Sequence, residues 1–456
     1  MNTLRRSTTL PLATLGLLVA CAGNGPTPPP QGITLSGRVQ DRDAEPISGA
    51  TVLAGKSSVT SSSDGTFTIP GVVTPYDITA ILPAQNTAVL YKGLTRPDPV
   101  LLYPDVTGAE RTATISGTVP PAAGSVTVVL FVSSGRYAFG AGRADATTGQ
   151  YALTVRWHGS YDTDPGQLSL LRLTTDATGL PTSYDGYASR PVTISAGGNF
   201  SGNDFAAVEL SDPPEQSISG AIAVPASYAL NARHLYVNFG RGGLYWEEAN
   251  PPSNAFTYTV PAQSGVAFAV AAVAVDGSSR WSSFFRGISG NSSNVSIPLA
   301  AAPQLALPAN GASGVDATTP FSWSQREETG VNVFKVWPSN STGPTYFVFT
   351  TAADANIPDL AAEGMGLTTG ASYYWHIDRF FPVASVDDAA AEGFRRLISD
   401  LDAGDVGETI SERFSFTTKA AAGAVAAFAT ASGAAAAEKG QRRGLVMRAP
   451  ILAGPR

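Results

Sequence analysis

Apolar and polar residues alternate with a period of two over several short stretches of the chain. Leu35, Gly37 and Val39 have polar neighbours, and the same pattern returns at 66–69. Because successive side chains of a β-strand point to opposite faces, this period predicts strands with one buried face. Further strands are predicted where apolar runs lie between turn residues, at 47–52, 235–239, 266–270, 370–377 and 414–418.

Composition favours the same fold class. The 456 residues include 47 Gly and 33 Pro, and only 14% of the residues are charged. A hydrophobic content of 43% is sufficient to build packed cores, so the chain is not a disordered one. Frequent turn residues between short apolar strands predict an all-β fold of three or four domains.

The segment 33–104 carries the clearest domain signature. Four stretches carry this signature, namely 36–39 (Ser-Gly-Arg-Val), 46–52 (Pro-Ile-Ser-Gly-Ala-Thr-Val), 64–69 (Asp-Gly-Thr-Phe-Thr-Ile) and 75–80 (Pro-Tyr-Asp-Ile-Thr-Ala). The segment resembles the carboxypeptidase regulatory-like domain, a seven-stranded transthyretin-like β-sandwich. That resemblance implies an accessory module without chemistry of its own. Ala44 stands where many relatives have glycine, which leaves the type of that turn open.

The opening of this segment recurs twice. Ile115-Ser116-Gly117 and Ile218-Ser219-Gly220 repeat the pattern of Leu35-Ser36-Gly37. Spacings of about 80 and 100 residues suit one sandwich each, which predicts further β-sandwiches at 111–210 and 216–299. The expected architecture is therefore a tandem array of Ig-like or transthyretin-like sandwiches.

The segment 301–418 has a different pattern. Trp323 suits the core tryptophan of an early strand, and Leu367 lies six residues before Tyr373, the spacing of a tyrosine corner. On these residues the segment resembles a fibronectin type III domain. That resemblance implies a fold and no particular activity.

A helical insertion is predicted at about 385–402, because apolar residues recur there at helical spacing and Ser385 is placed to cap the helix. Two interpretations remain open. The helix can cover an open end of its own sandwich, or its apolar stripe can bind a partner through Phe394, Leu397 and Ile398.

The first 21 residues predict where the protein works. Two arginines, an apolar run at 10–20 and small residues before Cys21 form a secretory signal over 1–20. Leu18-Val19-Ala20-Cys21 resembles the lipobox of bacterial lipoproteins, which implies a lipidated Cys21 and a lipid-anchored protein of the cell envelope. Ala22 is not the aspartate associated with inner-membrane retention, so the outer membrane is favoured. Residues 21–32 form a Gly/Pro tether.

Charge and cysteine content argue against several kinds of partner and site. The formal net charge is −7, which argues against nucleic acid as a partner. Cys21 is the only cysteine, so the sequence offers no disulfide within the chain and no cysteine-based metal site. The Ala/Gly-rich, basic tail at 419–456 is expected to be disordered.

No catalytic set is recognisable in the sequence. His158, His234 and His376 are scattered, and no spacing places two of them on one face. Glu247 and Glu248 are adjacent and would point to opposite faces of a strand. We therefore expect neither an enzyme nor a metal or cofactor site. A weak calcium site that uses Asp41 and Asp43 at a domain junction stays open.

Aromatic residues beside Gly, Ser or charged residues are the better binding candidates. Trp157, Tyr161, Tyr245 and Trp246 have such neighbours, which predicts loops or sheet edges able to stack on a sugar or peptide. Packing of these rings in a core is the open alternative.

The sequence thus predicts a non-enzymatic, lipid-anchored envelope protein whose β-sandwiches serve binding, adhesion or scaffolding. Two alternatives are an envelope carbohydrate-binding or hydrolytic protein, and a passive structural spacer. Besides the membrane at Cys21, its partner would be an envelope protein or a glycan.

Overall fold

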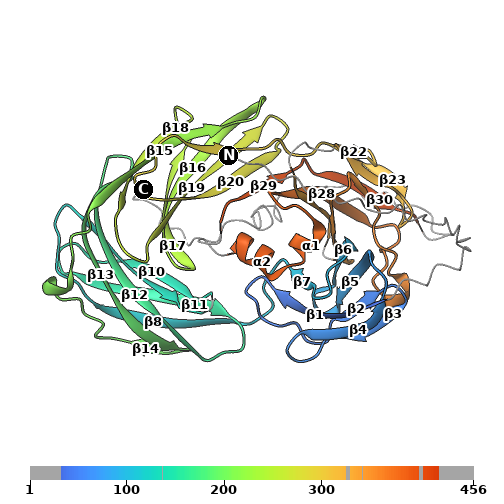
Figure 1. The fold of residues 1–456 in the computed structure, drawn as a ribbon, viewed down its shortest axis with the longest axis horizontal. Helices are drawn as coiled ribbons and strands as arrows, with labels where there is room; N and C mark the ends of the chain where they lie inside the picture. The colour runs from blue at the N-terminus through green and yellow to red at the C-terminus, as the bar shows by residue number, and fades with distance from the viewer. Residues whose placement is uncertain (1–31, 136, 325–328, 341, 400–403, 421–456) are drawn as a thin grey trace, which may run out of the picture.

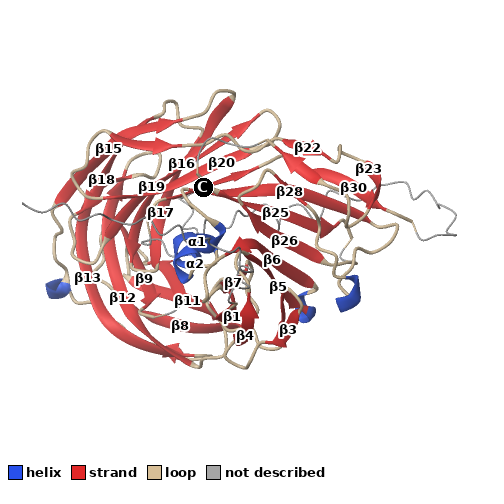
Figure 2. Cartoon of the chain, turned by 45° about the vertical axis from the view of Figure 1, so that its right-hand side comes forward, coloured by secondary structure: helices blue, strands red, loops and turns tan. Residues whose placement is uncertain are grey.

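The computed structural model describes residues 32–135, 137–324, 329–340, 342–399 and 404–420 (Figure 1). Most of this part of the chain is β-strand, so the expected all-β fold with several sheets is confirmed (Figure 2). Two short α-helices interrupt the strands, and single 3₁₀ turns lie at Pro83–Gln85, Ala207–Glu209 and Ala361–Glu363.

The strands form four units along the chain. The first unit contains β1 (Ile33–Asp41), β2 (Thr51–Ala54), β3 (Ser57–Thr60), β4 (Thr66–Val72), β5 (Tyr76–Leu82), β6 (Thr87–Leu94) and β7 (Val100–Tyr103). The second unit contains β8 (Glu110–Thr118), β9 (Val126–Ser133), β10 (Phe139–Arg143), β11 (Gln150–His158), β12 (Thr163–Thr175), β13 (Pro181–Ser195) and β14 (Asn199–Phe200). All seven strands of the second unit belong to one sheet.

The third unit contains β15 (Glu215–Ala223), β16 (Tyr228–Phe239), β17 (Gly242–Ala249), β18 (Ala255–Pro261), β19 (Ala267–Asp276), β20 (Trp281–Ile288) and β21 (Val295–Pro298). The fourth unit contains β22 (Leu305–Leu307), β23 (Ala312–Val315), β24 (Phe321–Trp323), β25 (Val331–Pro338), β26 (Thr345–Thr350), β27 (Asp354–Ala355), β28 (Ser372–Phe381), β29 (Val406–Ile410) and β30 (Phe414–Thr418). Three-stranded sheets β4-β1-β7, β18-β15-β21 and β22-β24-β27 lie in the first, third and fourth units.

One sheet of 14 strands combines the remaining strands of these three units. Its order is β17-β16-β19-β20-β29-β28-β25-β26-β6-β5-β2-β3, with β23 and β30 paired outside this path. The antiparallel pair β20–β29 joins the third unit to the fourth. The parallel pair β26–β6 joins the fourth unit to the first. In space the sheet therefore runs third, fourth, first, which is not the order along the chain.

The second unit contacts both the first unit and the third unit. Ser160 donates a backbone hydrogen bond of 3.4 Å to Glu45 of the first unit. The hydroxyl of Tyr184 donates one of 3.1 Å to the carbonyl of Thr259 in the third unit. With the two sheet junctions, these contacts place the four units in a closed ring (Figure 1).

Strand β19 has a core on each of its faces. Ala269 and Ala271 belong to the core shared with the first and fourth units, whereas Val270 and Ala272 belong to the core shared with the second unit. A strand buried on both sides needs apolar residues at successive positions. The unbroken apolar run at 267–275 meets that requirement.

The helical pair, α1 (Val386–Ala389) and α2 (Glu392–Ser399), lies at the centre of the ring in both ribbon views. The hydroxyl of Ser385 accepts a hydrogen bond of 3.1 Å from the backbone nitrogen of Asp388, so the predicted N-cap is confirmed. The sequence predicts one continuous helix, whereas the structure has a break between α1 and α2. At the break, the carbonyl of Ala390 accepts a hydrogen bond of 2.7 Å from Val100 in β7, while Phe394 donates to Ala391.

The fourth unit confirms two features predicted for its core. Trp323 is buried, beside Phe334. The hydroxyl of the fully buried Tyr373 accepts a hydrogen bond of 3.2 Å from the backbone nitrogen of Thr368. Because Thr368 follows Leu367, this is the contact expected of a tyrosine corner.

Ala44 adopts a conformation that suits glycine. Its φ is 66°, in the left-handed region, and its side chain is exposed. A Cβ atom in this region destabilises the folded state by about 1–2 kcal/mol. Replacing Ala44 by glycine removes this cost, but the greater conformational entropy of glycine in the unfolded chain offsets part of the gain in stability.

Ala44→Gly is therefore expected to raise the free energy of unfolding by about 0.5–1 kcal/mol, as measured by urea denaturation. Gly49 is the matched control, because its φ is 75° and no atom lies within 4 Å of the position that a Cβ would take. Gly49→Ala should lower stability by a similar amount. Loss of stability in Ala44→Gly would contradict the left-handed turn.

Candidate functional site

Each histidine lies beside one carboxylate, and the three pairs lie apart. They are His158 with Asp43 at 3.6 Å, His234 with Glu247 at 3.5 Å and His376 with Asp378 at 3.1 Å. No two histidines therefore share a site. Within the described residues, no group of three or more His, Cys, Asp or Glu side chains is placed to hold a metal ion.

Burial and neighbouring charges shift the pKa of one member in two of these pairs, His234 and Asp378. Burial lowers the pKa of His234 more than the neighbouring Glu247 raises it, which favours a neutral imidazole. Burial also raises the pKa of Asp378, but His376 and Lys335 outweigh this effect and hold that pKa below its usual value. Asp378 is therefore a charged group whose neighbours stabilise its charge within the sheet.

Glu247 and Glu248 point to opposite faces of β17, as predicted. Glu247 is paired with His234 and its side chain is half-exposed. Glu248 accepts hydrogen bonds of 2.6 and 2.8 Å from Arg233 and one of 2.6 Å from Tyr258. The two carboxylates do not share a site.

Trp157 is not an exposed binding residue. It lies in β11 with 1% of its surface exposed, and its indole nitrogen donates a hydrogen bond of 3.3 Å to the carbonyl of Tyr161. Tyr161 is half-buried and its ring stacks near that of Trp157, with centroids 6.2 Å apart. The expectation of an exposed ring at Trp157 is wrong, and the alternative of core packing holds for this residue.

Tyr245 and Trp246 are both half-buried, on opposite faces of β17. Tyr245 lies 5.5 Å from the ring of Tyr236 and packs against the core shared with the first unit. Trp246 packs against the core shared with the second unit. The structure therefore does not bring these two rings together in one binding site.

Phe394 of the helical pair is buried and contacts two strands of the large sheet. Its ring lies edge-on to those of Phe349 and Phe380, at 6.2 and 5.4 Å. The side chains of Leu397 and Ile398 lie outside the described residues. Phe394, with 3% of its surface exposed, is not available to a partner in this arrangement.

Hydrogen bonds join the helical pair to the first and second units. Asp387 of α1 accepts a hydrogen bond of 2.8 Å from the backbone nitrogen of Thr95. Gln40 of β1 donates one of 2.8 Å to Glu392. Arg395 of α2 donates to the hydroxyl of Tyr137 in the second unit. The predicted role of covering its own sandwich thus describes only part of what the helical pair contacts.

The carboxylate of Asp41 accepts hydrogen bonds from its own turn and from Thr107. One oxygen accepts from the backbone nitrogens of Asp43 and Glu45 at 2.9 and 3.0 Å, and the other accepts from Thr107 at 2.8 and 3.0 Å. Burial raises the pKa of Asp41 despite these donors. These hydrogen bonds give Asp41 a structural role at the junction for which the sequence leaves a weak calcium site open.

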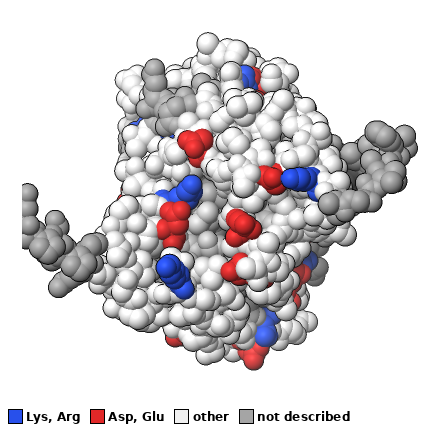
Figure 3. All heavy atoms as spheres, turned by 90° about the vertical axis from the view of Figure 1, so that its right-hand side faces the viewer, with Lys and Arg blue, Asp and Glu red and all other residues white. Residues whose placement is uncertain are grey.

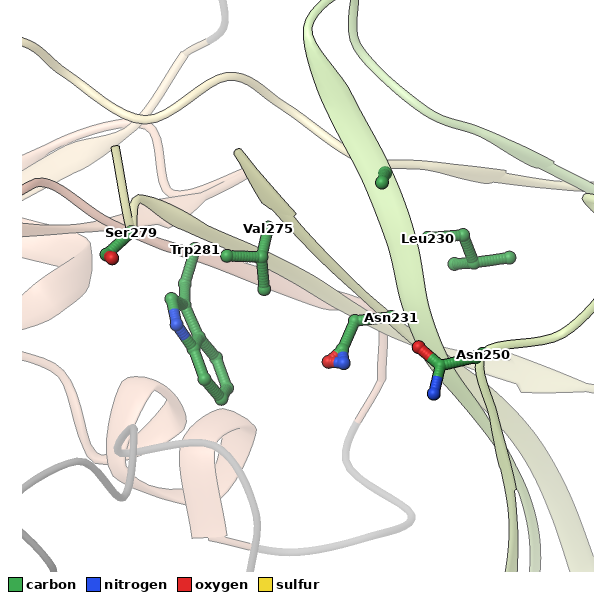
Figure 4. A pocket seen from close by; sticks show the side chains of 7 residues that line it. Leu230, Asn231, Asn250, Val275, Ser279 and Trp281 are labelled. Carbon is green, nitrogen blue, oxygen red and sulfur yellow. The ribbon is translucent and has the colours of Figure 1, made fainter. Parts of the chain in front are cut away.

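A pocket of about 400 Å³ opens at one end of the third unit's part of the large sheet (Figure 4). Its lining residues are Ala229, Leu230, Asn231, Asn250, Val275, Ser279 and Trp281. The indole of Trp281 lies on one side, and the carboxamides of Asn231 and Asn250 lie on the other. None of the lining residues carries a charge.

Backbone geometry fixes the polar side of this pocket. The pairing of β16 with β19 shifts between Leu230 and Ala232, so Asn231 lies in a β-bulge. A bulge redirects a side chain away from the regular alternation of the strand. Asn250 has a φ of 47°, and its backbone nitrogen donates a hydrogen bond of 2.7 Å to the carbonyl of Asn231.

The surface is poor in charge on the face turned toward the viewer in Figure 3. Lys and Arg side chains and Asp and Glu side chains are scattered there, singly or in small groups, among uncharged residues, and both signs are present. This face offers no strong electrostatic field to a charged partner.

No family model matches the chain, and no curated protein matches it. The regulatory-like and fibronectin-like resemblances therefore stay predictions. Solved structures with local similarity include the Bacillus anthracis TIE protein, at 11% identity over 59% of this chain and 50% of that one, with a TM-score of 0.15. This chain thus spans about half the length of that protein.

Two further structures come from a pilin and an adhesin. BcpA, the major pilin subunit of Bacillus cereus, matches at 9% identity over 59% of this chain and 99% of its own, with a TM-score of 0.15. A tetra-tandem repeat of a large adhesion protein matches at 13% identity over 86% of this chain and 100% of its own, also at 0.15. TM-scores this low do not establish a common arrangement, and they carry no functional argument.

Cys21, the tether up to residue 31 and most of the basic tail lie outside the described residues. Among the residues that are described, no helix combines the length and apolar character needed to cross a bilayer. Lipidation of Cys21 and the outer-membrane location stay predictions.

Proposed function

We propose that the protein is a non-enzymatic binding protein of the bacterial cell surface, held at the outer membrane by lipids on Cys21. The observation that carries this proposal is the 14-stranded sheet, which joins the first, third and fourth units into one body. Such a body keeps surface groups at fixed relative positions, a property useful for adhesion or scaffolding and not required of a flexible spacer.

The lipobox-like segment supports the membrane part of the proposal. A single acyl chain binds a bilayer only marginally, whereas two or more hold a protein stably. The cysteine of a lipobox is expected to carry several acyl chains. Residues 22–32, rich in Gly and Pro, then provide a tether between the bilayer and β1.

Cys21→Ser is expected to move the protein from the detergent-extracted membrane fraction to the soluble fraction, or to leave it unprocessed with its signal peptide attached. Immunoblots of fractionated cells and mass spectrometry of the N-terminus measure both outcomes. A protein that is processed at residue 21 and still requires detergent would overturn the lipid anchor.

Protease treatment of intact cells tests the surface location separately. The wild-type protein should be degraded by added proteinase K without permeabilisation, while a periplasmic control protein survives. Degradation only after the outer membrane is opened would overturn the surface location and leave the anchor intact.

A further inference from the structure

The pocket beside Trp281 contains hydrogen-bonding groups that the fold does not use. Asn231 and Asn250 are exposed, and their side chains make no hydrogen bond to any residue that the structure describes. Each carboxamide offers two donors and an acceptor. The bulge and the left-handed backbone hold these two residues in place, so their amide groups face the pocket without an internal partner.

The opposite side of the pocket is an aromatic surface held by two strands. Trp281 begins β20, where it is paired with Val275 of β19 and with Ile410 of β29. Its ring is half-buried, so one part packs on the protein while another part lines the pocket. A fixed indole provides a large apolar contact at a small entropic cost.

The charge of the site restricts its ligand. The nearest charged pair along the chain, Asp276 and Arg280, is joined by a salt bridge, and neither residue lines the pocket. Burial raises the pKa of Asp276, but its hydrogen bonds with Arg280 and neighbouring backbone groups outweigh this and keep that pKa low. An anionic or cationic ligand would therefore find no opposite charge in the pocket lining.

We infer that this pocket binds a neutral saccharide unit, with the apolar face of the sugar ring against Trp281 and its hydroxyls bonded to Asn231 and Asn250. A volume of about 400 Å³ is sufficient for one or two sugar rings. This inference rests on the proposed function, since it names the class of ligand that such a surface protein would recognise.

The purified residues 22–456 should be titrated with neutral oligosaccharides, namely cellohexaose, xylohexaose, mannohexaose and chitohexaose, and binding followed by calorimetry and tryptophan fluorescence. At least one of these probes is expected to bind. Trp281→Ala should weaken that binding at least tenfold, whereas Trp281→Phe, which keeps a ring face, should weaken it no more than about threefold.

Two polar variants keep the test independent of core stability. Asn231→Ala and Asn250→Gly remove exposed carboxamides, and glycine suits the φ of 47° at position 250. Each should weaken binding about threefold to tenfold. Leu307→Ala changes an exposed side chain in β22, outside the pocket, and should bind as the wild type does.

A wild-type protein that binds none of the four probes, or a Trp281→Ala variant that binds as tightly as the wild type, would overturn the saccharide site. Neither result would affect membrane fractionation or protease accessibility, which test the proposed function. Conversely, a soluble or periplasmic protein that still binds a probe through Trp281 would overturn the proposed location alone.

Discussion

Phe394→Ala is expected to lower the free energy of unfolding by about 3–5 kcal/mol, because it removes a buried ring from the centre of the molecule. The ring contacts Phe349 of β26 and Phe380 of β28, two strands that flank β25 in the large sheet. A cavity at this place can close only if the helical pair moves toward the sheet. Urea denaturation followed by fluorescence measures the effect.

The same substitution has a local effect that hydrogen exchange can detect. The amide of Val100 in β7 donates to the carbonyl of Ala390, at the break between α1 and α2. Loosening of the helical pair should therefore speed exchange of the Val100 amide more than that of amides in β12 or β13 of the second unit.

Phe394→Leu is the conservative control, expected to cost about 1–1.5 kcal/mol because most of the buried volume remains. A Phe394→Ala protein as stable as the wild type would show that the helical pair does not pack on the sheet. In that case the apolar stripe would again be a candidate for partner binding, as one interpretation of the sequence allowed.

Glu248→Gln is expected to cost about 3 kcal/mol, because it leaves the charge of Arg233 without its partner. Arg233 is 7% exposed and binds both oxygens of Glu248. Tyr258 donates a third hydrogen bond to the same carboxylate. Glutamine keeps the shape but supplies one acceptor oxygen and no charge.

Glu247→Gln on the same strand is the matched control. Its side chain is half-exposed and its contact with His234 is 3.5 Å long, so a change below about 0.5 kcal/mol is expected. Similar losses for the two variants would contradict the assignment of these carboxylates to opposite faces of β17. Thermal and urea unfolding of both proteins decides the question.

The pH dependence of the Glu248 interaction has a definite sign. Burial raises the pKa of Glu248, but hydrogen bonds from Arg233 and Tyr258 outweigh it, so the folded-state pKa lies below the usual value. The stabilisation is complete above the unfolded-state pKa, about 4.3, and is lost as the pH falls through the folded-state pKa. The stability difference between wild type and Glu248→Gln should therefore shrink in acid.

Local features of the fold could be predicted from the sequence. The period of two marks strand faces, and Ser385, Trp323 and Tyr373 each make the contact that their spacing indicates. These features depend on residues a few positions apart, whose geometry is fixed by the backbone of one element.

Pairing between units could not be predicted in this way. The apolar runs of β6 and β26 indicate strands that are buried on both faces, but any strand edge offers the same backbone donors and acceptors. The choice of β26 as the neighbour of β6 depends on the shape of the whole ring. The break in the helix also depends on a contact between units. The carbonyl of Ala390 accepts a hydrogen bond from the backbone nitrogen of Val100, which belongs to the first unit.

The aromatic binding candidates show that the residue types next to a ring in the sequence do not determine whether the ring is exposed. Trp157 is followed by His158 and Gly159, which suggests a loop, yet it continues the buried series of Tyr151, Leu153 and Val155 along β11. The alternation itself was the better guide. For the pocket beside Trp281, no signal in the sequence marks the bulge that redirects Asn231.

The pairing of β6 with β26 also constrains the order of events during biosynthesis. Strand β6 ends at Leu94, and its neighbour begins only at Thr345. Until residues 95–344 have been made, one edge of the first unit's sheet has no neighbour, and such edges are prone to pair with other chains. A chain that stops before β26 should therefore aggregate or be degraded even though all strands of its first unit are present.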